Sequence, residues 1–244
     1  LGMDRTEPLG VLKLYRPPEG AARERRAYQE WTPELARWTA SFHGGPDADP
    51  GALVLGYVSG KTATFAAAPA VFEAAGRFAA RLHGLAHHDA DPVPLVQALH
   101  QRLAATRNRG DSPDSAVCDA VETLIERGEF GARVPCHRDL APWNWRVDRG
   151  RLKVLDFGQS RPDTWLTDLV KLVVSWTPAQ EAAFFSGYGR GLSLEEARAL
   201  TGLVGLHGLG SVQWGLRHNQ ARPKAEGERA LIWFRAAHRR HGLG

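Results

Sequence analysis

The chain has 244 residues, of which 43% are hydrophobic and 24% charged, so it has an ordinary globular composition and enough length for a substantial core. Its formal net charge is +4, but the basic residues form no clustered run, so we expect no nucleic-acid partner. No segment reaches the roughly eighteen apolar residues of a membrane span, and no signal peptide opens the chain, so we expect no membrane attachment. Cys118 and Cys136 form no CxxC pair, which favours a reducing, cytoplasmic location.

The first quarter of the chain alternates strands with polar segments. Residues 11–16 (VLKLYR) predict a short strand, and residues 20–31, rich in Glu, Arg and Ala, predict a polar helix. Gly, Pro and Asp make residues 43–51 a loop, and the apolar run 52–58 (ALVLGYV) predicts a buried strand. This part therefore predicts a small sheet with one helix.

The rest of the chain is mainly helical, with one hairpin in its middle. Pro69 opens an amphipathic helix, and further helices are expected over 92–107 and 114–127. A strand-rich section over 133–157 follows, with Asp148-Arg149-Gly150 as its hairpin turn, and residues from 164 onward read as helix. Strands and helices that are segregated in this way predict an α+β fold rather than a doubly wound sheet, with a boundary near residues 58–68.

The residues that carry chemistry lie on both sides of this hairpin. Asp139 precedes it, Asn144 follows five residues later, and Asp156 closes the second arm. Phosphoryl transfer needs a carboxylate that accepts the proton of the attacking hydroxyl, and oxygen ligands for Mg²⁺ that neutralise the phosphates. Asp139 suits the first role, while Asp156 and Asn144 suit the second. The two hairpin arms can bring Asn144 and Asp156 together.

These residues resemble a known motif. His137-Arg138-Asp139 with Asn144, followed by Asp156-Phe157-Gly158, is similar to the HxDxxxxN and DFG motifs of the kinase superfamily. No activation segment follows, which disfavours a protein kinase. The sequence from Arg161 to Leu169 instead resembles the short link of aminoglycoside phosphotransferases and choline-type kinases. The resemblance implies a bilobal, protein-kinase-like fold, with a small β-containing N-lobe over 1–58 and a large helical C-lobe over 59–244.

The resemblance also implies a nucleotide site in the N-lobe. Lys13 resembles the lysine that contacts nucleotide phosphates, and Glu24 its helix partner, with Glu30 as the alternative and with Glu24 acting only by positioning Lys13. Residues 52–58, with Leu55 and Tyr57, resemble the connector strand that holds the base through backbone groups. No glycine-rich phosphate loop precedes Lys13, so either the N-lobe is incomplete in this sequence or its phosphate lid is reduced.

Four residues near the motif have less specific expectations. His137 is expected to support the catalytic loop rather than to react. Asp168 either braces that loop or caps the helix that follows. Trp143 is by default a packing residue, and it is also a candidate wall for the acceptor pocket. Arg138 stands where this branch more often has Gly, and it is expected to form a structural ion pair.

The predicted function is transfer of the γ-phosphoryl group from Mg²⁺-ATP or Mg²⁺-GTP to a hydroxyl of a small molecule. Residues 171–244 hold ten Lys or Arg against five Glu, a poor match for a polycationic acceptor, so a sugar, nucleoside, amino-alcohol or uncharged antibiotic is favoured. A nucleotide-binding pseudokinase or regulatory module is the alternative, although such a module has no need of an acceptor base such as Asp139.

Overall fold

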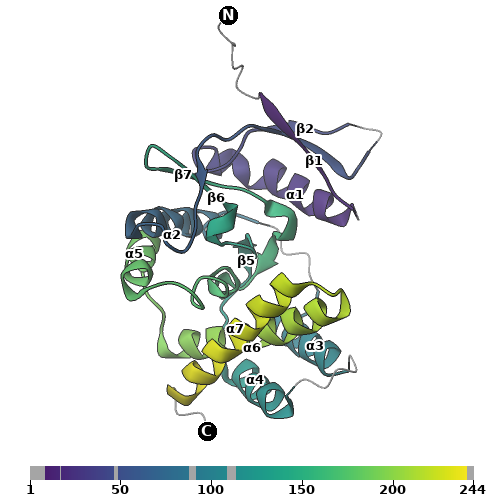
Figure 1. Ribbon diagram of the computed structural model, residues 1–244, viewed down its shortest axis with the longest axis vertical. Helices are drawn as coiled ribbons and strands as arrows, with labels where there is room; N and C mark the ends of the chain where they lie inside the picture. Colours follow the sequence, from purple (N-terminus) through teal and green to yellow (C-terminus); the bar gives the residue numbers. More distant parts are fainter. Residues whose placement is uncertain (1–8, 17, 47–48, 88–91, 109–113, 241–244) are drawn as a thin grey trace, which may run out of the picture. The chain divides into compact units, whose positions relative to one another are not determined.

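A computed structural model describes residues 9–16, 18–46, 49–87, 92–108 and 114–240 (Figure 1). The described residues fall into two compact units. The first draws on 1–87, 135–161 and 177–189, and the second on 88–134, 162–176 and 190–244. Helices and antiparallel sheets are both present, as the α+β prediction requires. The lobe boundary predicted at residue 58 stays a prediction. Among the described residues, no helix combines the length and the apolar character that crossing a membrane requires.

The first unit contains an antiparallel sheet in the order β1-β3-β2, formed by β1 (Gly10–Leu14), β2 (Phe42–Gly44) and β3 (Ala52–Gly56). The helix α1 (Glu19–Glu30) runs along this sheet (Figure 1) and buries Ala21, Glu24 and Tyr28 among others. The strands predicted at 11–16 and 52–58 are confirmed, with shorter bounds.

The strand β2 was not predicted, because it overlaps the expected loop at 43–51. The strand has only three residues, the register shifts between Phe42 and Gly44, and Gly44 has a φ of 96°. So short and irregular a strand has no readable periodicity. Residues 47 and 48 of the expected loop lie outside the described residues.

A second sheet of this unit contains the hairpin that the motif residues flank. Its order is β4-β6-β7, formed by β4 (Lys61–Thr62), β6 (Trp145–Asp148) and β7 (Arg151–Val154). Arg149 and Gly150 have φ angles of 47° and 76°, the positive values of a type I′ hairpin turn, so the predicted turn is confirmed. The short 3-10 helix η2 (Pro142–Asn144) enters this hairpin, and η3 (Phe157–Gln159) leaves it. The hairpin therefore sets the position of both halves of the motif.

Two helices of the first unit, α2 (Pro69–His83) and α5 (Pro178–Tyr188), lie side by side (Figure 1). Glycines allow this approach. A Cβ atom added to Gly76 of α2 would lie 2.0 Å from the carbonyl oxygen of Phe184, and one added to Gly187 of α5 would lie 2.0 Å from that of Glu73. Both obstacles are backbone atoms, which cannot rotate away. The 3-10 helix η1 (Thr32–Leu35) completes this unit's helical elements.

The second unit is mainly helical, and it contains the helices predicted over 92–107 and 114–127. Its helices are α3 (Leu95–Arg107), α4 (Ser115–Arg127), α6 (Leu194–Arg217), α7 (Ala221–Arg240) and the 3-10 helix η4 (Trp165–Leu169). The middle of α6 is buried from Ala199 to Leu206, and α4 and α7 pack against this helix. Two short strands, β5 (Val134–Cys136) and β8 (Arg161–Asp163), occur where the chain passes from one unit to the other.

The close approach of α2 and α5 leads to a test of stability. We expect Gly76→Ala to lower the free energy of unfolding by about 1–3 kcal/mol, because the new methyl group overlaps a backbone carbonyl. The matched control is Gly210→Ala in α6, where no atom lies within 4 Å of the added Cβ and the alanine should stabilise the helix by about 0.5–1 kcal/mol. Urea denaturation of both variants checks this, and equal effects would contradict the packing.

Candidate active site

The hairpin brings Asn144 and Asp156 together. Trp145 pairs with Val154 in the ladder, and the backbone N–H of Leu155 donates to the carbonyl oxygen of Asn144 at 2.8 Å, so the pairing continues to the residue before Asp156. Trp145 and Val154 are fully buried, which anchors this end of the hairpin. The proximity expected from the sequence is therefore a consequence of the register.

The loop from His137 to Asn144 is held by two of its own side chains, Asn144 and His137. The Asn144 amide group donates to both the backbone carbonyl of Asp139, at 2.8 Å, and its Oδ2 atom, at 3.0 Å. The buried His137 ring accepts from the backbone N–H of Asp139 at 3.2 Å and faces the carbonyl oxygen of Leu155 at 2.9 Å through Nε2. A neutral ring protonated at Nε2 satisfies both contacts. This geometry suits a supporting role for His137.

A cluster of charges lies beside this loop. The ammonium group of Lys13 is 2.8 Å from Glu24 Oε2 and 2.6 Å from Asp156 Oδ1. The alternative partner, Glu30, instead forms an exposed ion pair with Arg26 one turn away on the same helix. Burial alone would raise the pKa of Asp156, but the charge and hydrogen bond of Lys13 lower it below its ordinary value, so this carboxylate is ionised at neutral pH.

Glu24 contacts other groups besides Lys13. Its side chain is fully buried, and its Oε1 atom accepts from the backbone N–H of Phe157 at 3.0 Å. One residue earlier on the same helix, Arg23 Nε donates to the carbonyl oxygen of Gly158 at 2.8 Å. The expectation that Glu24 acts only by positioning Lys13 is therefore wrong, because the same carboxylate fixes the backbone that follows Asp156.

Tyr15 completes the cluster, and the sequence interpretation missed it. Its hydroxyl group donates to Glu24 Oε2 at 2.5 Å and lies 3.4 Å from Asp156 Oδ1, while Lys13 Nζ lies 4.8 Å from the centre of its ring. Burial, followed by the negative charges of Glu24 and Asp156, raises the pKa of Tyr15, which keeps the hydroxyl protonated. The available signal was its spacing, since Tyr15 follows Lys13 by two residues and side chains two apart on an extended chain share a face.

Backbone strain coincides with the motif. Asp156 has a φ of 67° and Arg138 a φ of 63°, both in the left-handed region that residues other than glycine adopt rarely. Such conformations cost on the order of 1–3 kcal/mol and persist where the surroundings impose them. At Asp156 those surroundings are the contacts of Lys13 and the hydrogen bond of Glu24 to the next residue.

These side chains line a cavity of about 290 Å³. Lys13, Glu24, Asn144 and Asp156 lie on its polar side, and the other residues include Leu55, Tyr57, Val58 and Trp143. Leu55 lies in the central strand β3, with its backbone paired on both sides, so it offers the cavity a side chain rather than backbone groups. Trp143 also packs edge-on against Phe65, with ring centres 6.2 Å apart. The cavity thus gathers residues expected to bind nucleotide and metal.

Comparison with known proteins establishes the family. A family model described as phosphotransferase enzyme family (APH) matches residues 5–203. The chain belongs to this phosphotransferase family. No curated protein matches it significantly in sequence.

Solved phosphotransferases and kinases share its fold. The apoenzyme of macrolide 2′-phosphotransferase MphH from Brachybacterium faecium superposes with a TM-score of 0.71 and 20% identity, over 91% of this chain and 84% of that one. Choline kinase LicA from Streptococcus pneumoniae gives a TM-score of 0.70 and 17% identity, over 93% and 88%. The GDP complex of aminoglycoside 2′-phosphotransferase-IIIa gives 0.71 and 14%, over 93% and 86%. Identities this low establish the fold and not the substrate.

Asp168 of this phosphotransferase lies in the other unit and is 1% exposed. It occupies the interior of η4, whose N-cap is Thr164, with a side chain that accepts from the backbone N–H of Leu166. The capping interpretation of Asp168 is therefore wrong. Its bracing role stays a prediction.

The residues of the first unit fit a divalent cation. Mg²⁺ prefers hard oxygen ligands, and Asp156 supplies an ionised carboxylate. The side-chain nitrogen of Asn144 donates its hydrogen bonds to Asp139. The side-chain oxygen of Asn144 is therefore the atom available to bind a metal. This donor set agrees with the metal role expected for both residues.

The contacts of Glu24 predict a large loss of stability on its removal. We expect Glu24→Ala to lower the free energy of unfolding by about 3 kcal/mol, because Lys13, the Tyr15 hydroxyl and the Phe157 N–H lose their acceptor together. Glu30→Ala, which removes an exposed ion pair, should cost less than about 0.5 kcal/mol. Urea denaturation measures both, and similar small effects would show that Glu24 is not the central acceptor.

Proposed function

We propose that this phosphotransferase transfers the γ-phosphoryl group of ATP or GTP, bound with Mg²⁺, to a hydroxyl group of a small molecule. One observation carries the proposal: Lys13, Glu24, Asn144 and Asp156 line one cavity, and Asn144 links it directly to Asp139. A cation for phosphates, oxygen ligands for a metal and a carboxylate for the acceptor thus lie within one connected set of contacts.

The nucleotide is proposed to bind along residues 1–58. Lys13 contacts its phosphates, with Glu24 holding the lysine in place. Because the backbone of Leu55 is paired within the sheet, backbone contacts to the base fall to the segment that starts at Tyr57, while Leu55 packs against the base. In this bilobal interpretation, residues 59–244 contribute the catalytic loop, the metal ligands and the acceptor pocket, and Trp143 forms part of that pocket's wall.

Asp156 and Asn144 would hold Mg²⁺, which neutralises the negative charge of the phosphates when it is bound. Asp139 accepts the proton of the acceptor hydroxyl. As that O–H bond breaks, the oxygen forms a bond to the γ-phosphorus, and the bond from phosphorus to the departing nucleoside diphosphate breaks. Asn144 orients the Asp139 carboxylate through its amide group, and His137 fixes the backbone of the same residue. Asp168 is proposed to brace the loop.

The acceptor is proposed to be a neutral or anionic hydroxyl compound. The similar solved structures include a macrolide 2′-phosphotransferase and a choline kinase, whose names both give small-molecule acceptors. The basic excess over 171–244 disfavours a polycation. The proposed enzyme is cytoplasmic and has no nucleic-acid partner, in agreement with the composition of the chain. The small size of the cavity agrees with a small-molecule acceptor.

The metal ligands can be tested through nucleotide binding. We expect Asp156→Ala to lose most of the gain in nucleotide affinity that Mg²⁺ produces, and Asn144→Ala to lose less, because a carboxylate binds the cation with charge and an amide does not. Without Mg²⁺, Asp156→Ala should bind the nucleotide at least as tightly as the parent, since Lys13 no longer pairs with that carboxylate. Isothermal titration with and without Mg²⁺ checks this. An unchanged Mg²⁺ dependence in Asp156→Ala would remove the assignment.

The role of Asp139 can be separated from structure and from nucleotide binding. Asp139→Asn keeps an oxygen that accepts from Asn144 but loses the base, so turnover should fall on the order of 10²–10⁴-fold. Nucleotide affinity and melting temperature should stay close to the parent values. Phosphoryl transfer is assayed with a panel of sugars, nucleosides, amino-alcohols and macrolides. Nucleotide binding with no turnover in the parent itself would instead favour the pseudokinase.

A further inference from the structure

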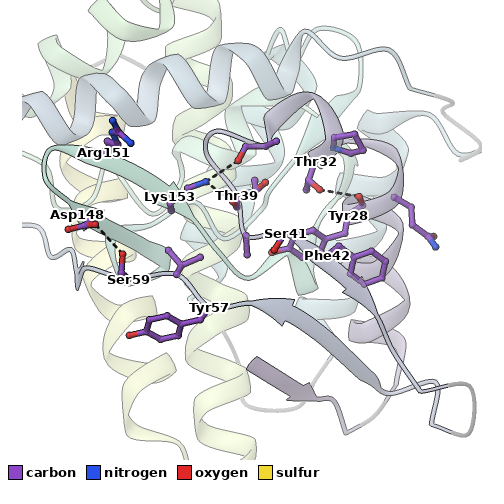
Figure 2. A pocket seen from close by; sticks show the side chains of 15 residues that line it. Tyr28, Thr32, Thr39, Ser41, Phe42, Tyr57, Ser59, Asp148, Arg151 and Lys153 are labelled. Atoms are coloured by element: carbon purple, nitrogen blue, oxygen red, sulfur yellow. Dashed lines mark hydrogen bonds between the residues drawn. The ribbon is translucent and has the colours of Figure 1, made fainter. Parts of the chain in front are cut away.

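A second and larger cavity lies in the same unit and is not part of the proposed active site. Its volume is about 710 Å³, within the range of small-molecule sites. Figure 2 shows its walls, which come from η1, the start of β2, the segment after β3 and the hairpin β6–β7. Among its lining residues are Phe42, Tyr57, Ser59, Asp148, Arg151 and Lys153.

The back wall of this cavity is fixed by hydrogen bonds. Lys153 Nζ donates to the carbonyl oxygens of Ala36 and Thr39, both at 2.9 Å, as the dashed lines in Figure 2 show. The next residue of β7, Val154, donates its backbone N–H to the carbonyl oxygen of Trp38 at 2.6 Å. Three bonds therefore tie the segment from Ala36 to Thr39 onto β7, so the cavity has a preformed wall.

The charge of this wall is positive and poorly balanced. Within the described part of the chain, Lys153 has no carboxylate at ion-pair distance, and burial lowers the pKa of its ammonium group. The side chain of Arg151, on the same strand, has neither an ion pair nor a hydrogen bond to any described residue. The carboxylate of Asp148, which accepts from the hydroxyl of Ser59 at 3.1 Å, also lines the cavity, so Asp148, Arg151 and Lys153 together leave a formal excess of one positive charge.

Aromatic and apolar groups form the rest of the lining. Tyr28, Phe42 and Tyr57 contribute rings, Pro33 and Val58 add aliphatic surface, and Tyr57 is 43% exposed. The lining thus combines a half-buried ammonium group without a carboxylate partner, a second unpaired cation and three rings. This combination suits a ligand that carries both a negative charge and a flat apolar part.

We propose that this cavity binds a small organic anion of the aromatic carboxylate or sulfonate type. Ala40, Tyr57 and Val58 line both this cavity and the one that holds Lys13 and Asp156. A ligand in one cavity therefore contacts the wall of the other, and the two sites are coupled. The coupling rests on the proposed nucleotide site, whereas the binding of the anion does not.

Anilinonaphthalenesulfonate, an aromatic anion that fluoresces when bound, is the probe for this site. We expect saturable binding to the folded protein with one site per chain. Arg151→Gln should weaken binding about fivefold to tenfold, because it removes one cation of the lining. Arg149→Gln is the matched control, since it removes a cation from the same hairpin at a position outside the cavity, and it should leave affinity unchanged.

Two further variants address the wall. Ala36→Trp places a large ring in the cavity and should abolish binding while the melting temperature is kept. Lys153→Met removes the ammonium group but also its bonds to Ala36 and Thr39, so Lys153→Arg is compared with it and should retain most of the affinity. Binding that is equal in the parent, Arg151→Gln and Ala36→Trp would overturn the proposal.

The coupling has its own measurement. The probe is titrated with and without ATP and Mg²⁺, and the nucleotide is titrated with and without the probe. Each pair of titrations gives the ratio by which one ligand changes the affinity of the other. The two ratios should be equal and should differ from one. Ratios of one would overturn the coupling. Asp156→Ala should retain probe binding, so failure of the phosphotransferase proposal remains distinguishable from failure of this one. If nucleotide displaces the probe and Arg151→Gln does not change probe affinity, the probe binds in the Lys13 cavity. That result would refute the second site.

Discussion

The buried carboxylate of Glu24 is the contact on which the rest of the site depends. Its Oε2 atom meets the ammonium group of Lys13 and the hydroxyl group of Tyr15, and its Oε1 atom meets the backbone N–H of Phe157. One side chain on α1 thereby connects β1, which carries Lys13, to Phe157, which follows the β6–β7 hairpin. A carboxylate buried to this extent is tolerated only because hydrogen bonds and an opposite charge compensate its desolvation.

The position of Asp156 follows from two constraints that act from opposite sides. The hairpin register delivers the chain at Leu155, which is still paired to Asn144. Glu24 and Arg23 then hold the two residues after Asp156 through their backbone groups. Between these fixed points Asp156 adopts a left-handed conformation, which directs its carboxylate to Lys13. The strain is thus a local cost that the surrounding hydrogen bonds offset.

The parts of this site that the sequence predicted are those encoded by local geometry. Asn144 and Asp156 could be placed together because a hairpin fixes which residues of its two arms lie opposite each other. Lys13 and Glu24 could be paired because the resemblance to the kinase motifs implies both residues. Tyr15 and the Phe157 contact of Glu24 were missed, because they depend on how α1 packs against a segment 133 positions away. The short strand β2 and the second cavity lacked any pattern in the sequence, since loops and backbone carbonyls build them. Of the two alternatives for Asp168, capping was wrong because the side chain of Thr164, four residues earlier, caps that helix.

The ion pair between Lys13 and Asp156 has a consequence for how a metal ion and a nucleotide would bind together. Lys13 is only 27% exposed, and its ammonium group contacts both carboxylates at once. Asp156 cannot give full charge to a metal while it neutralises Lys13, and Lys13 cannot give full charge to a phosphate while it neutralises Asp156. A metal ion alone, or a nucleotide alone, must break this pair, and it leaves one partly exposed charge less well compensated. The two together replace it with two new pairs, carboxylate to metal and ammonium to phosphate. Glu24 keeps Lys13 in place throughout, because its own bond to the ammonium group is independent of Asp156. For the proposed function, the geometry of the cluster therefore predicts that metal and nucleotide each strengthen the binding of the other, as expected of a site that takes its nucleotide as the Mg²⁺ complex.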